Sequence, residues 1–380
     1  MKLTKLIWRN LFRRPGRTFL SVCGIACAMT LLMLVESLSM GMNEALSGDE
    51  SARTLIVYRK NRYCPQTSFL PEWYTTRIAD VPGVESVLPV KVYLSNCRAS
   101  LDLVAFQGTP VDTLLKARAI QLIDGNMEQF RTEHDAALVG SDFALRKGVS
   151  VGDTFRFGDI DVKVRGIFES EAAIEEGLIL THLEFLQRAG PVNRLGTVTQ
   201  FEVKVTDASK AREISREIDS LFVTAEEPTD TRAQVAFLER ATRDLREILG
   251  IGRLLGFACV IVVLALVANT VFMSVQERVR EFGVFRTLGF REEHLGWVVL
   301  AESLALSLLG GLVGLGVSLA ILNGMHLSIG TEGVPVNFAT SPALFARGLG
   351  IALVTGALAG LAPAIRSARA PIVASLRSAT

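Results

Sequence analysis

The chain has 380 residues, of which 49% are hydrophobic and 21% are charged, and its mean hydropathy is +0.35. This hydropathy is too high for an ordinary soluble protein, and the charged fraction is too high for a protein made only of membrane spans, so spans together with a sizeable water-exposed domain are expected. The formal net charge of +1 gives no overall electrostatic case for nucleic-acid binding.

Residues 1–17 form a basic amino-terminal segment without an acidic residue. Its basic residues are Lys2, Lys5, Arg9, Arg13, Arg14 and Arg17. A basic amphipathic segment of this kind binds well to an anionic membrane surface. Residues 18–40 are mostly apolar and long enough to cross a bilayer of about 30 Å, and their length favours a retained membrane helix over a signal peptide.

Three further apolar segments bring the number of predicted transmembrane helices to four. The predicted spans are residues 18–40, 254–275, 297–322 and 343–365. The segments between and after them are a large external domain with stalk helices (41–253), a charged segment (276–296), a short loop (323–342) and a tail (366–380). The predicted fold is therefore a membrane α-helical protein with an α+β domain inserted between its first and second spans.

Basic residues predict the orientation of the spans. Lys and Arg are concentrated in the amino-terminal segment, in residues 276–296 and in the tail, whereas residues 323–342 contain neither. Because cytoplasmic loops carry the excess of basic residues, both termini and the 276–296 segment are predicted to be cytoplasmic. The 41–253 domain is then periplasmic.

The external region reads as an α+β domain with alternating patterns. Residues 54–60, 84–94 and 101–108 have strand patterns, and a helix is expected to start within 71–78. Residues 137–166 read as a small β module with Gly-Asp turns. Residues 201–205, 209–221 and 222–225 read as strand, helix and strand.

An apolar stripe precedes the second span. Its members are Val235, Leu238, Thr242, Leu245 and Leu249, which alternate three and four residues apart. This spacing is typical of a coiled coil, and it predicts a stalk that extends the second span beyond the membrane. The alternative is an amphipathic helix packed on its own domain.

The charged segment after the second span reads SVQERVREFGVFRTLGF over residues 274–290. Apolar Val279, Phe282 and Phe285 recur at helical spacing among charges of both signs, which predicts a short amphipathic helix with one buried stripe. Gly283 permits a bend, and Gly289 suits the left-handed end of a helix. The alternative is a solvated loop with ordinary charge pairs.

This segment resembles the signature of the FtsX-like ABC permeases. The run ERVREFGVFRTLGF, the following AESLALSLLGGLVGLGVSLA and the closing LAGLAPAIRSARAPIVASLR all fit that pattern, which has a Glu at position 302. The external VPGVESVLPV and AALVGSDFALRKGVSVGDTF resemble the periplasmic domain of the macrolide-exporter type. The superfamily also includes lipoprotein-releasing and cell-division permeases.

The resemblance implies that the segment is a coupling helix that docks on a separate ATP-hydrolysing subunit. The implied ATPase-coupling residues are Glu277, Arg278, Arg280, Glu281, Phe282, Gly283, Phe285, Arg286 and Gly289. Phe282 and Phe285 are the expected apolar anchors, because aromatic residues often dominate a desolvated interface. Glu281 and Arg286 are the expected polar contacts.

The sequence gives no support for an enzyme active site, a cofactor or a metal. It contains no phosphate-binding G-x-x-x-x-G-K-[ST] motif, no H-E-x-x-H and no G-x-S-x-G, so ATP hydrolysis is expected in a partner subunit. Glu302 is an acid within a span, which is costly in lipid and a default candidate for function. A structural hydrogen-bonding role is favoured over a substrate contact.

Two cysteines fall in the external region. Cys64 and Cys97 are a candidate disulfide, because an oxidising compartment lets them pair; two unpaired thiols are the alternative. Cys23, Cys27 and Cys259 lie in predicted spans and are expected to be small packing residues.

By the resemblance, the chain is expected to be the permease subunit of a mechanotransmission-type export or extraction system in a bacterial inner membrane. The expected partners are a second permease copy, two ATPase subunits, membrane lipids and, on the outer side, a periplasmic adaptor and an outer-membrane channel. One alternative is a cell-division permease that regulates a peptidoglycan hydrolase and transports nothing. A weaker alternative is a membrane sensor without an ATPase.

Overall fold

The computed structural model describes residues 13–46, 53–62, 67–94, 104–170, 172, 174–190, 192–289, 291–325, 328–331 and 334–368. They divide into a helical unit, within Met1–Ser37, Leu249–Gly324 and Ala339–Thr380, and an external unit, within Leu38–Ile248 and Met325–Phe338. The disulfide candidates Cys64 and Cys97 lie outside the described residues, so their pairing stays a prediction.

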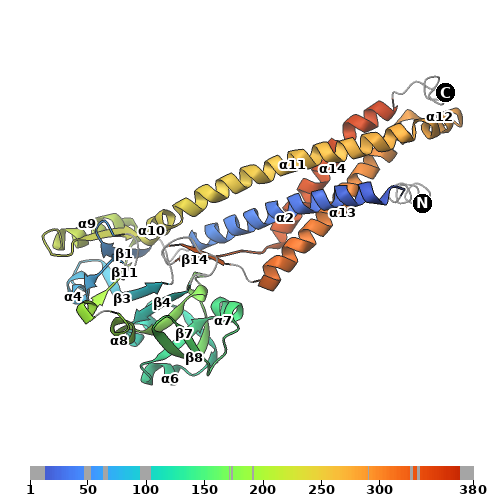
Figure 1. Cartoon of the computed structure of the whole chain (residues 1–380). Coiled ribbons are helices and arrows are strands. Elements are labelled where there is room, and N and C mark those ends of the chain that lie inside the picture. The colour runs from blue at the N-terminus through green and yellow to red at the C-terminus, as the bar shows by residue number, and fades with distance from the viewer. Residues whose placement is uncertain are drawn as a thin grey trace. The chain divides into compact units, whose positions relative to one another are not determined.

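Four long helices dominate the membrane part of the chain (Figure 1). They are α2 (Pro15–Leu46), α11 (Arg243–Glu277), α13 (Glu292–Met325) and α14 (Pro342–Ala368). All four are long and apolar enough to cross a membrane, which confirms the predicted four-span architecture. A span needs about 20 residues, so the 35 residues of α11 extend well past one bilayer core.

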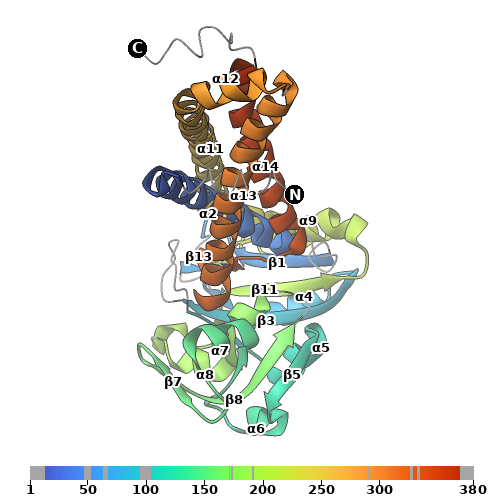
Figure 2. The ribbon, with the colours of Figure 1, turned by 90° about the vertical axis from the view of Figure 1, so that its right-hand side faces the viewer.

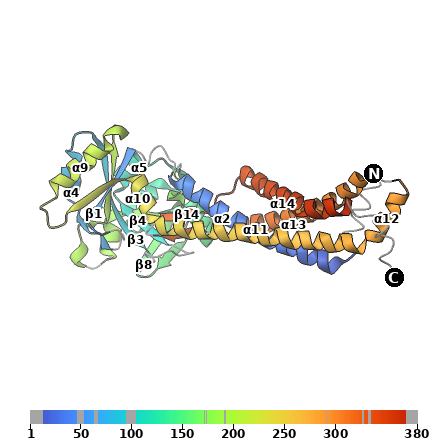
Figure 3. The ribbon, with the colours of Figure 1, turned by 90° about the horizontal axis from the view of Figure 1, so that it is seen from above.

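Small residues let long helices of the bundle, which Figure 3 shows from above, approach closely at two contacts. A Cβ on Gly314 of α13 would lie 2.6 Å from the carbonyl oxygen of Ala26 in α2. A Cβ on Gly360 of α14 would lie 1.9 Å from Oγ of Ser303 in α13. These two positions therefore accept only glycine, in line with the small-residue contacts that pack helices in lipid.

The external unit is built on one ten-stranded sheet (Figure 2). Its order is β12 (Thr229–Ala233), β1 (Thr54–Arg59), β11 (Gln200–Val205), β3 (Val84–Leu94), β4 (Ala105–Thr109), β9 (Ile179–His182), β6 (Ala136–Gly140), β8 (Ile160–Ser170) and β5 (Ile120–Gly125), with β7 (Thr154–Phe157) also paired to β8. The long strand β3 joins two halves, because its first part pairs with β11 and its last four residues pair with β4.

Short helices and two small hairpins complete the external unit. The helices are α4 (Tyr74–Ala79), α5 (Val111–Ala117), α6 (Met127–Thr132), α7 (Ser141–Lys147), α8 (Leu183–Arg188), α9 (Ala211–Leu221) and α10 (Gln234–Ala241). The hairpins pair β2 (Leu70–Pro71) with β10 (Thr197–Val198), and β13 (Ser328–Thr331) with β14 (Val334–Asn337).

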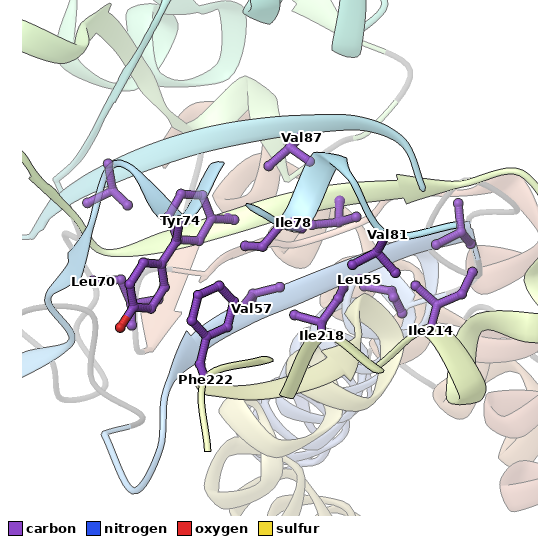
Figure 4. Close-up of a cluster of buried hydrophobic side chains, with 14 of the residues drawn as sticks. Leu55, Val57, Leu70, Tyr74, Ile78, Val81, Val87, Ile214, Ile218 and Phe222 are labelled. Carbon is purple, nitrogen blue, oxygen red and sulfur yellow. The ribbon is translucent and has the colours of Figure 1, made fainter. Parts of the chain in front are cut away.

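One face of β1, β11 and β3 is covered by α4 and α9 (Figure 4). Ile214 and Ile218 of α9 are buried over this face, and the ring of Tyr74 stacks on Phe222 with centroids 3.9 Å apart. The predicted strand at residues 222–225 is wrong. Phe222 instead ends α9 with its ring buried, and the next strand, β12, begins at Thr229.

The apolar stripe before the second span lies on α10 and on the first turns of α11. Leu238, Thr242, Leu245 and Leu249 are all buried, as a packed stripe requires. The two helices are separated only by Thr242, whose hydroxyl donates to the carbonyl oxygen of Leu238 at 2.7 Å. The extension of this stripe into a stalk stays a prediction.

The outer edge of the sheet is closed by one side chain. Strand β12 is an edge strand, and a free edge invites pairing with other chains. The carboxylate of Asp219 in α9 accepts hydrogen bonds from the backbone N–H of Thr231 at 3.0 Å and from the hydroxyls of Thr229 and Thr231 at 2.8 and 2.7 Å. Burial raises the pKa of Asp219, against the effect of these hydrogen bonds.

An Asp219→Ala substitution is expected to lower the free energy of unfolding of the external unit by about 1–3 kcal/mol, because it leaves the buried Thr231 N–H without its acceptor. Urea unfolding, followed by Trp73 fluorescence in a background without the other two tryptophans, measures this change. Asp112→Ala removes an exposed carboxylate paired with Arg131 and should be near neutral. Equal effects of the two substitutions would contradict the edge-closing role.

Candidate functional site

The charged segment folds as a short helix, α12 (Val279–Thr287), directly after α11. The two helices are separated at Arg278, which has φ −108° and ψ 9°. The bend is therefore at Arg278 and not at the predicted Gly283, which lies buried inside α12. Gly289 has φ 91°, which confirms the predicted left-handed residue at the end of the helix.

The inner face of α12 packs into its own helical bundle. Phe282 is only 7% exposed and belongs to the bundle core, together with Val275 and Leu295. Phe285 is partly buried against the same core. In this structure the bundle buries Phe282 and partly buries Phe285. That the two rings anchor a partner protein stays a prediction.

A buried ion pair fixes the start of α12 to α13. The Nη2 atom of Arg278 lies 2.7 Å from Oε1 and 2.6 Å from Oε2 of Glu302, and each of the two side chains is 6% exposed. The Ser274 hydroxyl, which also accepts a hydrogen bond from Arg278, donates to Glu302 Oε1 at 3.1 Å. Desolvated charges need such partners, since burying either one alone is costly.

This ion pair joins two of the predicted site residues. Glu302 has the hydrogen-bonding environment that the structural interpretation of an intramembrane acid requires. Arg278, predicted as a coupling residue, points into the bundle and pairs with Glu302 in this structure, and its contact with a partner stays a prediction. The local sequence could not reveal the pair, because its two residues are 24 positions apart and on different helices.

Ser274 and Thr270 are site residues that the sequence pattern did not single out. They lie one and two helical turns before Arg278 on the same side of α11. The Thr270 hydroxyl is 3.0 Å from that of Ser21 in α2. One sequence signal could have revealed this polar row: Thr270, Ser274 and Arg278 follow one another at a spacing of four residues.

The outer face of α12 is exposed and mixed in character. Val284 is 46% and Leu288 is 70% exposed, and they are four residues apart, so they lie on one side of the helix. Arg280 and Glu281 are exposed one turn earlier. We call Arg280, Glu281, Val284, Thr287 and Leu288 the outer face. An exposed apolar pair with charged neighbours is the composition of a protein-binding surface.

Arginines from the start of α2 reach the acidic residues around α12. Arg13 Nη1 lies 2.8 Å from Glu281 Oε1, while Arg14 and Arg17 lie 2.9 and 3.4 Å from Glu277 Oε1. Most of these side chains are well exposed, so each pair contributes at most about 1 kcal/mol. These ion pairs matter for geometry more than for stability, because they join the chain around the start of α2 to the end of α11 and to α12.

Potential metal ligands are scattered among the described residues. Among them, no group of three or more His, Cys, Asp or Glu side chains could hold a metal ion. His134 and His182, distant in sequence, have ring centroids 5.8 Å apart, and His182 Nε2 lies 2.6 Å from the carbonyl oxygen of Phe130. This is the environment of a packed structural histidine.

Two family models match the chain. A model described as FtsX-like permease C-terminal matches residues 253–372, and one described as MacB-like periplasmic core domain matches residues 18–221, which is more than half of the chain. The first includes α12 with its ion pair, and the second includes most of the external unit.

Two curated relatives match most of the chain. The macrolide export ATP-binding/permease protein MacB of Wolinella succinogenes is 29% identical over 64% of this chain and 37% of its own length. The pyoverdine export ATP-binding/permease protein PvdT of Pseudomonas fluorescens (strain Pf0-1) is 23% identical over 98% of this chain and 58% of its own length. The chain thus spans less than two thirds of the length of either relative.

The periplasmic region of MacB from Actinobacillus actinomycetemcomitans, a solved structure, covers 51% of this chain and 96% of its own, with 9% identity and a TM-score of 0.37. The two family models match the helices and the inserted α/β domain that the structure separates into its two units. The chain belongs to the FtsX-like ABC transporter permeases with a MacB-like periplasmic core domain.

Proposed function

We propose that this chain is the permease subunit of a mechanotransmission-type ABC export or extraction system. In this system α12 couples ATP hydrolysis by a separate cytoplasmic ATPase to conformational change in the external domain. The observation that carries the proposal is the two-sided character of α12. Its inner face is fixed to the spans through Phe282 and the Arg278–Glu302 pair, and its outer face exposes Val284 and Leu288.

A helix held this way can transmit movement. Because the inner face is packed into the four-helix core, a displacement of α12 must move α11 and α13 as well. Because Val284 and Leu288 of the outer face are exposed, a partner can bind them without unfolding the bundle. Val284 and Leu288 replace the two phenylalanines as the proposed apolar anchors, with Arg280, Glu281 and Arg286 as polar contacts.

The proposed assembly has two copies of this chain and two ATPase subunits in a bacterial inner membrane, surrounded by membrane lipids. Both termini and α12 are on the cytoplasmic side, and the external unit is periplasmic. The names of the two relatives contain both "ATP-binding" and "export", which supports ATP-driven export. A periplasmic adaptor and an outer-membrane channel complete the proposed path.

The second candidate is a cell-division permease that regulates a peptidoglycan hydrolase. The match of residues 18–221 to the MacB-like core domain favours export. The matched residues include most of the large inserted domain, which in an export system would act on the substrate outside the membrane. The neighbouring genes separate the two candidates: an ATPase with an adaptor supports export, and an ATPase with a hydrolase supports regulation.

The proposed orientation predicts which positions a membrane-impermeant thiol reagent reaches in intact cells. In a cysteine-free background, Asp207→Cys in the external unit is expected to be labelled, because it is exposed on the periplasmic side. Arg286→Cys in α12 is expected to react only after the membrane is opened. Labelling of Arg286→Cys in intact cells would overturn the orientation.

A Leu288→Asp substitution is expected to weaken ATPase binding by about tenfold or more, because it places a charge in the apolar centre of the proposed interface. Recovery of the ATPase with affinity-purified permease of equal abundance measures this effect. Leu145→Asp makes the same chemical change at an exposed leucine of the external unit and is the matched control. Equal recovery with both variants would remove the docking assignment.

A further inference from the structure

A polar cavity of about 250 Å³ opens where the helical unit meets its charged segment. It is lined by Arg13 and Arg14 just before α2, by Arg17 and Thr18 in the first turn of α2, by the last turns of α11 and by Glu302 and Leu306 of α13. Two candidate spans end here, because one begins at Pro15 and another ends at Glu277. The cavity therefore lies at the level where a membrane span gives way to headgroups.

The charges around this cavity do not cancel. Arg278 is neutralised by Glu302, and Arg13 pairs with Glu281. Arg14 and Arg17, however, both turn to a single oxygen of Glu277. Counting the groups described at the cavity, two guanidinium groups share one carboxylate, which leaves one positive charge in excess.

A phosphodiester fits this excess in charge and in geometry. It carries one negative charge, and guanidinium groups bind phosphate oxygens through paired N–H donors. The hydroxyl of Thr18, also in the lining, is a further donor type. The helix α2 begins at Pro15, so the positive end of its dipole lies at the same place and also favours an anion.

The depth of the cavity favours a lipid over a free phosphate ion, because an apolar candidate span begins at Pro15. Phe19 and Leu20 follow the lining residue Thr18 along α2, and they are 69% and 66% exposed. Successive residues of a helix face different sides, so these two side chains mark the depth at which lipid surrounds α2 and are not a wall of the cavity. A lipid at this depth would place its phosphodiester at the arginines and its acyl chains along the span. A free phosphate would use only the arginines.

We propose that this cavity binds the phosphodiester headgroup of an anionic membrane lipid. Arg14 and Arg17 hold the phosphate, and the acyl chains run along the apolar span that begins at Pro15. Glu277 competes with the phosphate for the same two guanidinium groups, so it limits the affinity. The site rests on α2, α11 and α13 alone and does not depend on ATPase docking.

Native mass spectrometry of the full chain in detergent tests the site with phosphatidylglycerol, phosphatidylcholine and inorganic phosphate as probes. The wild type is expected to bind phosphatidylglycerol about tenfold more tightly than phosphatidylcholine, because choline cancels the charge of the phosphodiester. Tight binding of inorganic phosphate without lipid preference would overturn the lipid assignment. Equal binding of the two lipids would also overturn it.

Variants then locate the binding. Arg14→Gln and Arg17→Gln are each expected to weaken phosphatidylglycerol binding about tenfold, since each removes a charged hydrogen-bond donor. Arg291→Gln makes the same charge change at an exposed arginine outside the cavity lining and should leave binding unchanged. Binding that falls equally in all three variants would reduce the site to non-specific attraction and reject it.

A substitution with the opposite effect keeps the proposal testable if the arginine variants fail to fold. Glu277→Gln removes the competing carboxylate while keeping the side-chain shape. It is expected to tighten phosphatidylglycerol binding, whereas a merely structural role of Glu277 would leave binding unchanged or weaken it. Unchanged or weaker binding in this variant would overturn the proposed competition and the site with it.

Discussion

An Arg278→Ala variant is expected to lose about 3–5 kcal/mol of bundle stability, because removal of one partner leaves the other charge buried and unpaired. Glu302 would keep only the hydroxyl of Ser274 as a described donor. Unfolding of the purified chain in mixed micelles with increasing sodium dodecyl sulfate measures the change.

The exposed pair between Arg13 and Glu281 provides the matched control. Both side chains are about half exposed or more, so Arg13→Gln is expected to change stability by at most about 1 kcal/mol. An Arg278→Met/Glu302→Leu double variant should recover most of the loss, because apolar replacement of both partners of a buried pair is often neutral. An Arg278→Ala variant as stable as the wild type would contradict the structural role of the Arg278–Glu302 pair.

A Phe282→Ala variant is expected to destabilise the bundle by about 3–5 kcal/mol, since truncation of a buried aromatic ring leaves a cavity in packed surroundings. The same detergent unfolding experiment measures this loss. Val284→Ala, two residues away on the outer face, should leave stability nearly unchanged and weaken ATPase recovery instead.

This pair of variants distinguishes the two faces of α12. If Phe282→Ala left stability unchanged but abolished partner binding, the ring would be an interface anchor, as its sequence pattern suggested. If Val284→Ala unfolded the bundle, the outer face would be part of the core. Either result would contradict the orientation of α12 described above.

The spans and the long strands could be predicted because their signals are local and long. The strand at residues 84–94 coincides with β3, and each predicted span lies inside one long helix. Burial in a membrane or a sheet imposes a repeating pattern on many consecutive residues, and such a pattern needs no knowledge of partners. Gly289 was predictable for a similar reason, because left-handed helix ends favour glycine.

The site was harder to predict, because periodicity shows which residues share a face but not what the face contacts. Phe282 and Phe285 pack into the bundle core, as two members of an apolar stripe should. The periodicity did not reveal that this core belongs to the same chain, and docking of the stripe on a partner protein stays a prediction. The outer pair of Val284 and Leu288 is only two residues long and left no periodic signal of its own.

Contacts between distant segments were outside the reach of the sequence altogether. The Arg278–Glu302 pair joins residues 24 positions apart, and the Arg17–Glu277 and Arg13–Glu281 pairs join residues 260 and 268 positions apart. The predicted strand after α9 failed for a related reason. Phe222 looks like a strand residue, but the tertiary contact with Tyr74 keeps it at the end of the helix.

Site-specific photo-crosslinking tests the coupling role of α12 most directly. A photoreactive amino acid at Leu288, in cells that also produce the cognate ABC ATPase, is expected to give an adduct with the ATPase. The same residue at Trp297, which is 69% exposed on α13 within a candidate span, is expected to give none. Two results would contradict docking through the outer face. One is the absence of an ATPase adduct at Leu288, and the other is adducts of equal strength at Leu288 and Trp297.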